Sequence, residues 1–317
     1  PAPPPPPPLP TRPCYAPAVP YLPTTYFCLE EPESRYETAR AAILPLPFER
    51  TTSFGKGTVD GPAAILRASQ ALELYDEELD AEPSNIGVAT LPPFVPEAHD
   101  MEAALEEIRA EARRHLESGK FLVALGGEHS VTSALAFAAR DVHGEIGVVQ
   151  LDAHADLRDS FEGTPWSHAS VLRRIVEEGL PTLALGIRSL SRAEAELIRQ
   201  RQLPVLWGHE LAAPDLLDRF RRRLDDLPER VYLTVDLDFL DPALLPATGT
   251  PEPGGATWYR TLSLLRELFR RKEVVAMDVV ELAPIGGQPA SDFLAAKLAY
   301  KCLGYLQDRE TKGRARV

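Results

Sequence analysis

Short apolar runs alternate with longer segments of helical period along most of this chain of 317 residues. Such alternation is typical of βαβ units, in which helices connect the strands of a parallel sheet and cover its faces. The expected strands are the eight runs 42–46, 86–89, 121–125, 146–151, 182–187, 204–206, 231–235 and 274–279. The expected helices are 61–79, 99–118, 131–140, 169–178, 191–201, 213–224, 259–270 and 290–306. The sequence therefore predicts an α/β fold with one large, mainly parallel sheet.

The first 40 residues differ in composition from the rest of the chain. Twelve of the first 23 residues are proline, including the run from Pro3 to Pro8. Proline has no amide donor and a restricted backbone, so such a segment builds no regular packed element. We expect a proline-rich arm over residues 1–40 and one folded domain over residues 41–317. A solvated or surface-draped arm is favoured over a docking ligand for a partner domain.

The acidic balance of the chain limits its partners. Lys plus Arg total 34 and Asp plus Glu total 47, which gives a formal net charge of −13. This charge disfavours nucleic acid and anionic membranes as partners and suits a small cationic ligand. The cysteines are few and widely spaced, which fits a reducing compartment. No apolar run is long enough to span a bilayer, and the proline-rich start lacks the pattern of a secretory signal. We therefore expect a cytoplasmic protein.

Metal-competent side chains directly follow several of the expected strands. Six of them stand at the ends of three strands: His129, Asp152, His154, Asp156, Asp236 and Asp238. Because the carboxyl ends of parallel strands meet at one edge of the sheet, we expect these groups to lie close together. Four buried carboxylates need positive charge among them, and this ligand set is too large and too rich in oxygen for one tetrahedral zinc. It favours two harder ions such as Mn²⁺, which acidify a shared water, and so indicates a hydrolase.

Each of these residues has a less specific explanation when it is taken alone. His129 after a Gly-Gly turn would usually be a turn or core residue, and an Asp-x-Asp pair often caps a helix. The occurrence of all the motifs directly after buried strands favours the metal site. Asp241, which precedes Pro242, is better explained as a turn residue than as a ligand. Glu128 and Asp278 are candidates for contacts that orient the ligands.

As a set, the motifs resemble those of the ureohydrolase family of arginases and agmatinases. They are GGEHS at 126–130, DAHADLRD at 152–159, SHAS at 167–170, DLDFLDP at 236–242, ATGTPEPGG at 247–255 and MDVVELAP at 277–284. The resemblance implies a three-layer α/β/α fold of the arginase type, with a central, mainly parallel eight-stranded sheet and a ureohydrolase catalytic domain over 41–317. It also implies two manganese ions per subunit, whose bridging hydroxide attacks a guanidinium carbon and releases urea. Homo-oligomers, trimers or hexamers, are implied as well.

The same resemblance assigns roles to single residues. It distributes the metal ligands over two ions, with some carboxylates bridging: His129 and Asp156 on one, His154 on the other, and Asp152, Asp236 and Asp238 as further ligands. Glu281, which follows the run 274–279, is placed against the substrate guanidinium, where a carboxylate can accept two parallel hydrogen bonds. His168 matches the histidine that passes a proton to the leaving amine, a task suited to its ordinary pKa.

The loop 159–168 is expected to select the substrate. Arginases carry a Ser-Gly-Asn type of segment here, whereas this chain lacks the asparagine and has Phe161 and Trp166. The loop resembles those of agmatinases and suits an apolar stem whose ammonium contacts an aromatic face. We therefore expect hydrolysis of agmatine to putrescine and urea. The alternatives are guanidinobutyrase, guanidinopropionase or arginase activity, a zinc deacetylase of the same fold, or a metal-binding scaffold without activity; Trp166 has the alternative of packing between subunits.

Overall fold

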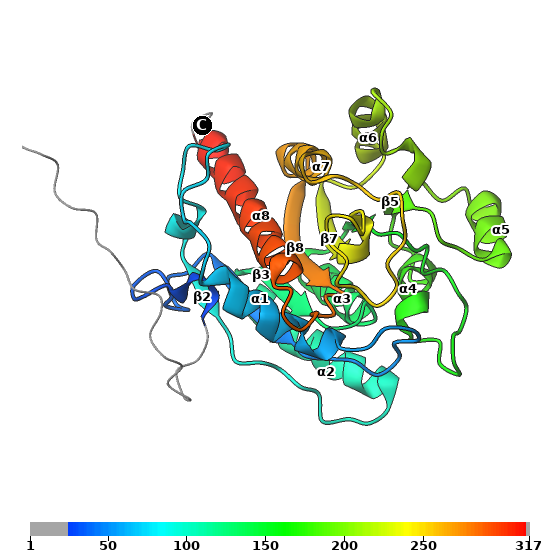
Figure 1. The fold of residues 1–317 in the computed structure, drawn as a ribbon, viewed down its shortest axis with the longest axis horizontal. Helices are drawn as coiled ribbons and strands as arrows, with labels where there is room; N and C mark the ends of the chain where they lie inside the picture. Colours follow the sequence, from blue (N-terminus) through cyan, green and yellow to red (C-terminus); the bar gives the residue numbers. More distant parts are fainter. Residues whose placement is uncertain (1–24, 315–317) are drawn as a thin grey trace, which may run out of the picture.

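The computed structural model describes residues 25–314. In that part of the chain one sheet contains eight strands (Figure 1): β1 (Ala41–Leu46), β2 (Val88–Thr90), β3 (Phe121–Gly126), β4 (Gly147–Leu151), β5 (Thr182–Ile187), β6 (Val205–Trp207), β7 (Arg230–Asp236) and β8 (Glu273–Val280). The strand order is β2-β1-β3-β8-β7-β4-β5-β6, and all pairings among these strands are parallel. The predicted strands are therefore confirmed, with ends that shift by a residue or two.

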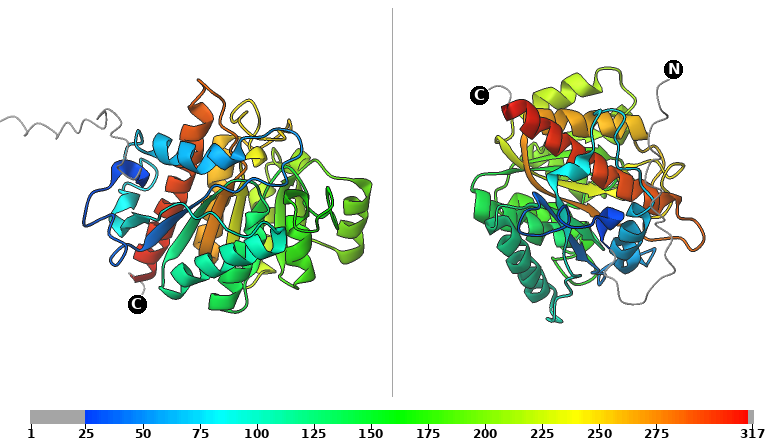
Figure 2. Two further views of the ribbon diagram at one scale, coloured as in Figure 1. Left: turned by 90° about the horizontal axis from the view of Figure 1, so that it is seen from below. Right: turned by 90° about the vertical axis from the view of Figure 1, so that its left-hand side faces the viewer.

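Helices cover both faces of the sheet, which gives the three layers that Figures 1 and 2 show. Neighbouring residues of a strand point to opposite faces, so Ile43 packs in the core cluster of one helical layer and Leu44 in that of the other. The first layer contains α1 (Gly61–Ser69), α6 (Leu216–Asp225), α7 (Trp258–Arg271) and α8 (Ala290–Arg314). The second contains α2 (Met101–Glu117), α3 (Val131–His143) and α4 (Val171–Glu177), while α5 (Arg192–Arg201) packs beside β5.

Helix α1 is shorter than the sequence predicts. The pattern indicates a helix over 61–79, but α1 ends at Ser69. Turn-type backbone hydrogen bonds follow directly, such as Leu72 N–H to Ser69 O at 3.2 Å. Further on, the Oδ1 atom of Asp76 accepts the backbone N–H groups two and three residues ahead, each at 3.1 Å, which holds 76–79 in a turn. The same carboxylate pairs with the buried ammonium of Lys301 on α8 at 2.9 Å. Apolar side chains of this segment such as Leu72 pack in the same core cluster as α8 without being helical.

Packed structure begins before residue 41. Tyr26 and Phe27 lie in a short 3-10 helix, Tyr26–Cys28, and are buried in the core cluster that contains α1 and α8. The Tyr26 hydroxyl donates to the carbonyl of Ala296 on α8 at 2.6 Å. Burial of these two aromatic side chains therefore anchors the C-terminal part of the expected 1–40 arm. The proline-rich composition of residues 1–40 gave no indication of this packing. Residues 1–24 lie outside the described residues.

Among residues 25–314, no helix has both the length and the apolar character that crossing a membrane requires.

The strands that carry candidate site residues at their ends are neighbours in the sheet. Strands β3, β8, β7 and β4 are consecutive in the strand order. Their carboxyl ends therefore bring together residues from distant parts of the chain, as the sequence predicts for a parallel sheet. The backbone N–H of His129 after β3, for example, donates to Glu281 after β8, which lies 152 residues further along.

Candidate metal centre

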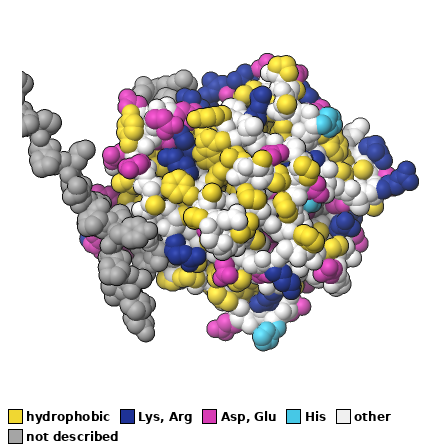
Figure 3. Space-filling view, in the orientation of Figure 1, with side chains coloured by type: hydrophobic (Ala, Val, Ile, Leu, Met, Phe, Trp, Pro, Cys, Tyr) yellow, Lys and Arg dark blue, Asp and Glu magenta, His cyan; other side chains and the backbone are white. Residues whose placement is uncertain are grey.

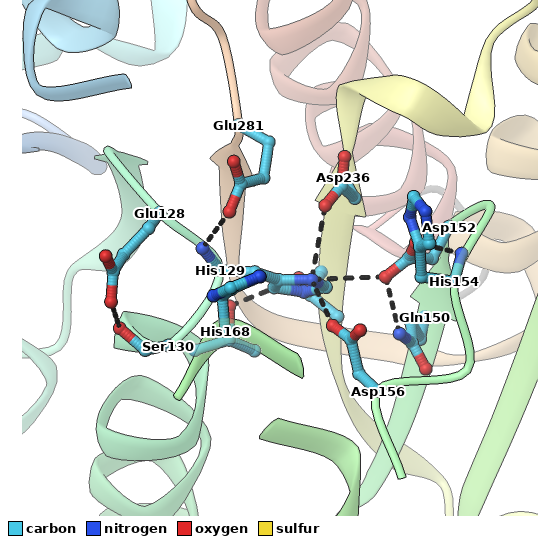
Figure 4. A network of polar contacts seen from close by, with 12 residues as sticks. Glu128, His129, Ser130, Gln150, Asp152, His154, Asp156, His168, Asp236 and Glu281 are labelled. Carbon is cyan, nitrogen blue, oxygen red and sulfur yellow. Dashed lines mark hydrogen bonds and ion pairs between the residues drawn. The ribbon is translucent and has the colours of Figure 1, made fainter. Parts of the chain in front are cut away.

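The side chain of His129 lies at the centre of a group of carboxylates (Figure 4). Its Nδ1 atom is 3.0 Å from Asp156, 3.1 Å from Asp152 and 3.3 Å from Asp236, measured to Oδ2 in each case. This Nδ1 atom is buried and makes no well-directed hydrogen bond within the described part of the chain. A ring nitrogen that faces three carboxylate oxygens without a good hydrogen bond is arranged to share a cation with them.

A second group lies beside the first and shares Asp152 with it. His154 Nδ1 is 2.9 Å from Asp238 Oδ2 and 3.7 Å from Asp152 Oδ1. Within residues 25–314, two triads have ligand atoms close enough to hold one ion each: His129 with Asp152 and Asp156, and Asp152 with His154 and Asp238. The shared carboxylate has one oxygen toward each histidine, which is the arrangement that a bridging ligand needs.

Backbone hydrogen bonds fix the loops that carry these carboxylates. Asp152 Oδ1 accepts the N–H of His154 at 2.6 Å, and Asp236 Oδ1 accepts the N–H of Asp238 at 2.9 Å. Asp238 Oδ1 in turn accepts the N–H of Ala153 at 3.0 Å, which ties the loop after β7 to the loop after β4. The Asp-x-His and Asp-x-Asp spacings therefore let each first Asp fold its own loop while its Oδ2 atom faces Nδ1 of His129. In Asp152 this Oδ2 atom also accepts the side-chain amide of Gln150 at 2.6 Å.

His129 is oriented from behind by a row of hydroxyl groups. Its Nε2 atom is 2.9 Å from the hydroxyl of Thr234, which donates to Asp278 Oδ1 at 2.6 Å. Asp278 Oδ2 also accepts the hydroxyls of Thr132 at 2.8 Å and Tyr232 at 2.7 Å. Because the Thr234 proton goes to the carboxylate, its oxygen accepts N–H from Nε2 of His129. The Nδ1 lone pair then faces the carboxylates, as metal ligation through Nδ1 requires.

The expectation that Asp278 supports the ligands therefore agrees with its contacts, whereas the hydroxyl residues of this row were missed by sequence reasoning. Tyr232 and Thr234 stand two apart inside the buried strand β7, and Thr234 is paired with Asp278 in the sheet register. Polar residues at alternate positions of an apolar strand are the signal that could have indicated them. Asp241 is a turn residue, as expected: it accepts the N–H groups of Ala243 at 2.9 Å, Gly254 at 2.9 Å and Gly255 at 3.1 Å.

Burial and neighbouring charges shift the pKa values of several site residues. Burial lowers the pKa of His154, but hydrogen bonds to Asp152 and Asp238 outweigh this and raise the pKa to about 12. Burial likewise lowers the pKa of His129, yet its carboxylate neighbours bring that pKa well above the ordinary value. Burial raises the pKa of Asp156 to about 7, with a further contribution from the charge of Asp152. Four carboxylates face two imidazoles here, so the residues present fit divalent cations, which would supply the missing positive charge.

Glu281 lies beside the backbone of His129, at the end of β8 (Figure 4). Its Oε1 atom accepts the backbone N–H of His129 at 2.6 Å, and its side chain is buried. Burial raises the pKa of this carboxyl to about 8 despite that hydrogen bond. Its backbone φ is 65°, and that of Asp156 is 51°, both in the left-handed region that non-glycine residues rarely adopt. Strained backbone of this kind is concentrated at functional sites.

The loop 159–168 has a different environment for each of its candidate residues. Phe161 meets His168 edge-on with ring centroids 5.7 Å apart, and the guanidinium of Arg158 lies 5.0 Å from the Phe161 ring centroid. Trp166 is partly buried against the core cluster of α2 and α3. Within the described structure one face of Phe161 is thus occupied by Arg158, and Trp166 packs on its own subunit.

His168 is partly buried at the start of a short 3-10 helix, His168–Ser170. Burial lowers its pKa below the ordinary histidine value. Its Nδ1 atom is 3.1 Å from the hydroxyl of Thr51, a residue that sequence reasoning did not single out. Glu128 is fully buried beside both and accepts the Thr51 hydroxyl at 2.8 Å. Glu128 was expected to orient the metal ligands, but its hydrogen bonds go to Arg50, Thr51 and Ser130, and through Thr51 they lead to His168.

The arginase family model matches residues 39–304 of this chain. The chain is 41% identical over 293 residues to the N(1)-aminopropylagmatine ureohydrolase of a Synechocystis species, covering 90% of this chain and 95% of that protein. It is 34% identical to the agmatinase of Pyrococcus horikoshii, covering 88% and 96%. The crystal structure of agmatine ureohydrolase of Thermoplasma volcanium aligns with a TM-score of 0.81 at 29% identity, covering 89% and 95%. On these grounds the chain belongs to the arginase family of hydrolases.

Proposed function

We propose that this protein is a two-metal ureohydrolase that cleaves the guanidinium group of N(1)-aminopropylagmatine, releasing urea and the corresponding polyamine. The observation that carries the proposal is the pair of ligand triads that share Asp152, next to the buried carboxyl of Glu281. The 41% identity to an enzyme of that name supports this substrate. Agmatine, the substrate expected from the sequence, is the second candidate, supported by the 34% identity to an agmatinase.

The chain offers a set of ligands that suits two Mn²⁺ ions. His129, Asp156 and Asp236 would hold one ion, His154 and Asp238 the other, and Asp152 would contact both. Their oxygen-rich chemistry favours Mn²⁺ over zinc. When bound, two such ions lower the pKa of a water that they share and so supply a nucleophile near neutral pH.

Glu281 orients the substrate in this proposal. A carboxylate and a planar guanidinium form two parallel, charge-assisted hydrogen bonds, which place the guanidinium carbon in a fixed position. The burial of Glu281 excludes water from that pair and strengthens it. Because burial also raises the pKa of Glu281, a cationic substrate would favour its charged form on binding.

His168 completes the reaction. Water adds to the guanidinium carbon, the bond from that carbon to the alkyl-substituted nitrogen breaks, and this nitrogen takes up a proton. His168 takes a proton that the attacking water gives up and passes it to the leaving nitrogen. The second proton of the water, carried by the hydroxyl on the same carbon, also ends on the leaving nitrogen as the carbonyl of urea forms. The products are therefore urea and a primary ammonium, and the enzyme gains or loses no proton over the cycle.

Substrate selection is assigned to the loop 159–168. Phe161 and Trp166 remain the candidate contacts for the polyamine stem, with Phe161 the better placed because it touches His168. The net charge of −13 favours the approach of a multiply charged cation. We also expect a trimer or hexamer in the cytoplasm, which light scattering on the purified protein and cell fractionation would check.

Urea release from a panel of guanidines tests the proposal. The Mn²⁺-loaded protein is assayed with N(1)-aminopropylagmatine, agmatine, arginine, guanidinobutyrate and guanidinopropionate. We expect the highest kcat/KM for N(1)-aminopropylagmatine, followed by agmatine. A preference for arginine or for a guanidino acid would overturn the substrate assignment. The absence of urea from every compound would support a metal-binding scaffold without activity.

A further inference from the structure

One hydroxyl group, that of Thr51, holds His168 at two atoms. Thr51 lies in the loop after β1 and is 8% exposed. Its Oγ1 atom is 3.1 Å from His168 Nδ1 and accepts the backbone N–H of His168 at 3.0 Å. The same oxygen is 2.8 Å from Glu128 Oε1. The side chain and the backbone of His168 are therefore both held by hydrogen bonds to the same atom, Oγ1 of Thr51, in a different loop.

Thr51 is itself held firmly against the Gly-Gly turn after β3. Its backbone N–H donates to Glu128 Oε2 at 2.6 Å, and so does that of Arg50. Glu128 Oε1 also receives the hydroxyl of Ser130 at 2.5 Å. Close approach of the two loops requires glycine at Gly127, because a Cβ there would lie 2.1 Å from the carbonyl oxygen of Phe48. The position of Thr51 is thus fixed by the same turn that carries His129.

The hydrogens around Thr51 Oγ1 can be assigned by counting donors and acceptors. A hydroxyl has one proton and two acceptor positions. The backbone N–H of His168 occupies one acceptor position, and the hydroxyl proton goes to Glu128, whose other partners at this site are donors. The second acceptor position then faces His168 Nδ1, which must carry a proton to bond there. In its neutral form His168 therefore has Nδ1 protonated and Nε2 free to accept a proton.

We propose that Thr51 is a positioning residue for His168, which fixes the ring orientation and the Nδ1–H tautomer so that Nε2 is the nitrogen that exchanges protons. This inference rests on the proposed function above, in which His168 carries a proton to the leaving amine. Nε2 accepts the proton, which gives an imidazolium that still donates from Nδ1 to Thr51, and the same Nε2–H then passes to the leaving nitrogen as its bond to carbon breaks. Glu128 keeps the Thr51 proton directed away from His168 throughout.

Kinetics of Thr51 variants test this role. Thr51→Val removes the hydroxyl with little change of shape, and we expect kcat to fall by about 10- to 100-fold while KM changes by less than about threefold. Thr51→Ser keeps the hydroxyl and should restore most of kcat. Thr52→Val is the matched control, since Thr52 bonds to Glu49 rather than to the site, and it should behave like the parent enzyme. Unchanged kcat in Thr51→Val would overturn the proposal.

A double-mutant comparison separates positioning from general stability. If Thr51 acts through His168, Thr51→Val should add less than about a twofold loss of kcat in a His168→Ala background. A full loss in that background would mean that Thr51 acts elsewhere, and the proposal would fail. Bound Mn²⁺ per chain, which should equal that of the parent, shows that the loss does not come from the metal site.

The tautomer is measured directly by ¹⁵N NMR of histidine-labelled, metal-free protein, with the His168 signals identified by their absence in His168→Ala. We expect a neutral His168 with protonated Nδ1, and a shift toward the Nε2–H tautomer in Thr51→Val. An Nε2–H tautomer in the parent protein would contradict the proposal. This measurement does not depend on turnover, so it decides the role of Thr51 even if the parent protein released no urea, an outcome that would refute the proposed function instead.

Discussion

The Nε2 atom of His129 lies 2.9 Å from the hydroxyl of Thr234, and that hydroxyl donates to the carboxylate of Asp278 at 2.6 Å. These two hydrogen bonds fix which ring nitrogen of His129 faces the metal site. Thr234→Val should therefore weaken Mn²⁺ binding by roughly 10- to 100-fold, as is usual when a partner behind a ligand histidine is lost. Competition with a metal chelator measures the affinity. Thr261→Val, a buried Thr of α7 that bonds to the carbonyl of Thr257, is the control and should leave the affinity unchanged.

Removing the shared carboxylate should have a larger effect on metal content than removing one that serves a single triad. Asp152 belongs to both triads and Asp238 to one. We expect Asp238→Asn to retain about one ion per chain and Asp152→Asn to retain less than that, since each ion loses a charged ligand. Elemental analysis after gel filtration gives the stoichiometry. Asp241→Asn, which changes a turn carboxylate, should keep two ions; equal losses in the two ligand variants would contradict a bridging role for Asp152.

Glu281→Gln should separate substrate orientation from metal binding. The amide oxygen can still accept the N–H of His129, so the local backbone is preserved. The charged partner of the guanidinium is lost, and we expect kcat/KM to fall on the order of 10²-fold or more with unchanged Mn²⁺ content. Urea release and elemental analysis on the same preparation provide both values. Activity within tenfold of the parent would exclude Glu281 from the role proposed here.

The lowered pKa of Glu267 on α7 predicts how the stability of the protein depends on pH. Burial raises its pKa, but hydrogen bonds from Arg221, Arg270 and Arg271 outweigh this and lower the pKa from 4.5 to about 2. A depressed pKa means that the folded state favours the charged form, so the contribution to stability is complete above pH 4.5 and is lost as the pH falls toward 2. The difference in unfolding free energy between the parent and Glu267→Gln should shrink over that range.

Urea unfolding of the metal-free protein at several pH values measures this difference. Glu273→Gln is a suitable control, because Glu273 pairs with Arg230 at 3.3 Å and both side chains are about half exposed. Exposed pairs of this kind contribute little, so that variant should track the parent at every pH. A constant effect of Glu267→Gln across the acidic range would show that the arginine cluster does not depress the pKa of Glu267.

The sheet could be predicted from the sequence because its strands are buried on both faces. Runs such as 121–125 are then continuously apolar and are bounded by polar residues, which makes their number and ends easy to locate. The C-terminal half of the helix expected over 61–79 is not helical; there Asp76 pairs with Lys301, 225 residues away, and periodicity carries no information about such a partner. The burial of Tyr26 was missed because its partner Ala296 is likewise distant in the sequence.

The candidate ligands could be predicted because they interrupt these apolar runs at a single edge of the sheet. Asp152 and His154 are conspicuous directly after β4, whereas Thr51 is a common loop residue whose importance comes only from what it contacts. Thr234 gives only a weak signal, as one of two polar residues at alternate positions of an apolar strand. The role of Phe161 in the loop 159–168 is similarly ambiguous in the sequence. A phenylalanine there can contact either a substrate cation or the guanidinium of Arg158, and the sequence does not distinguish the two.

The left-handed backbone at Asp156 and Glu281 has a consequence for protein engineering. Such a conformation costs roughly 1–2 kcal/mol at a non-glycine residue, which is a sizeable fraction of the stability of a typical domain. Substitution by glycine would relieve it, so a library screened only for heat resistance should enrich glycine at these two positions and lose turnover as it does so. Thermostable variants of this enzyme should therefore be selected with an activity screen in parallel.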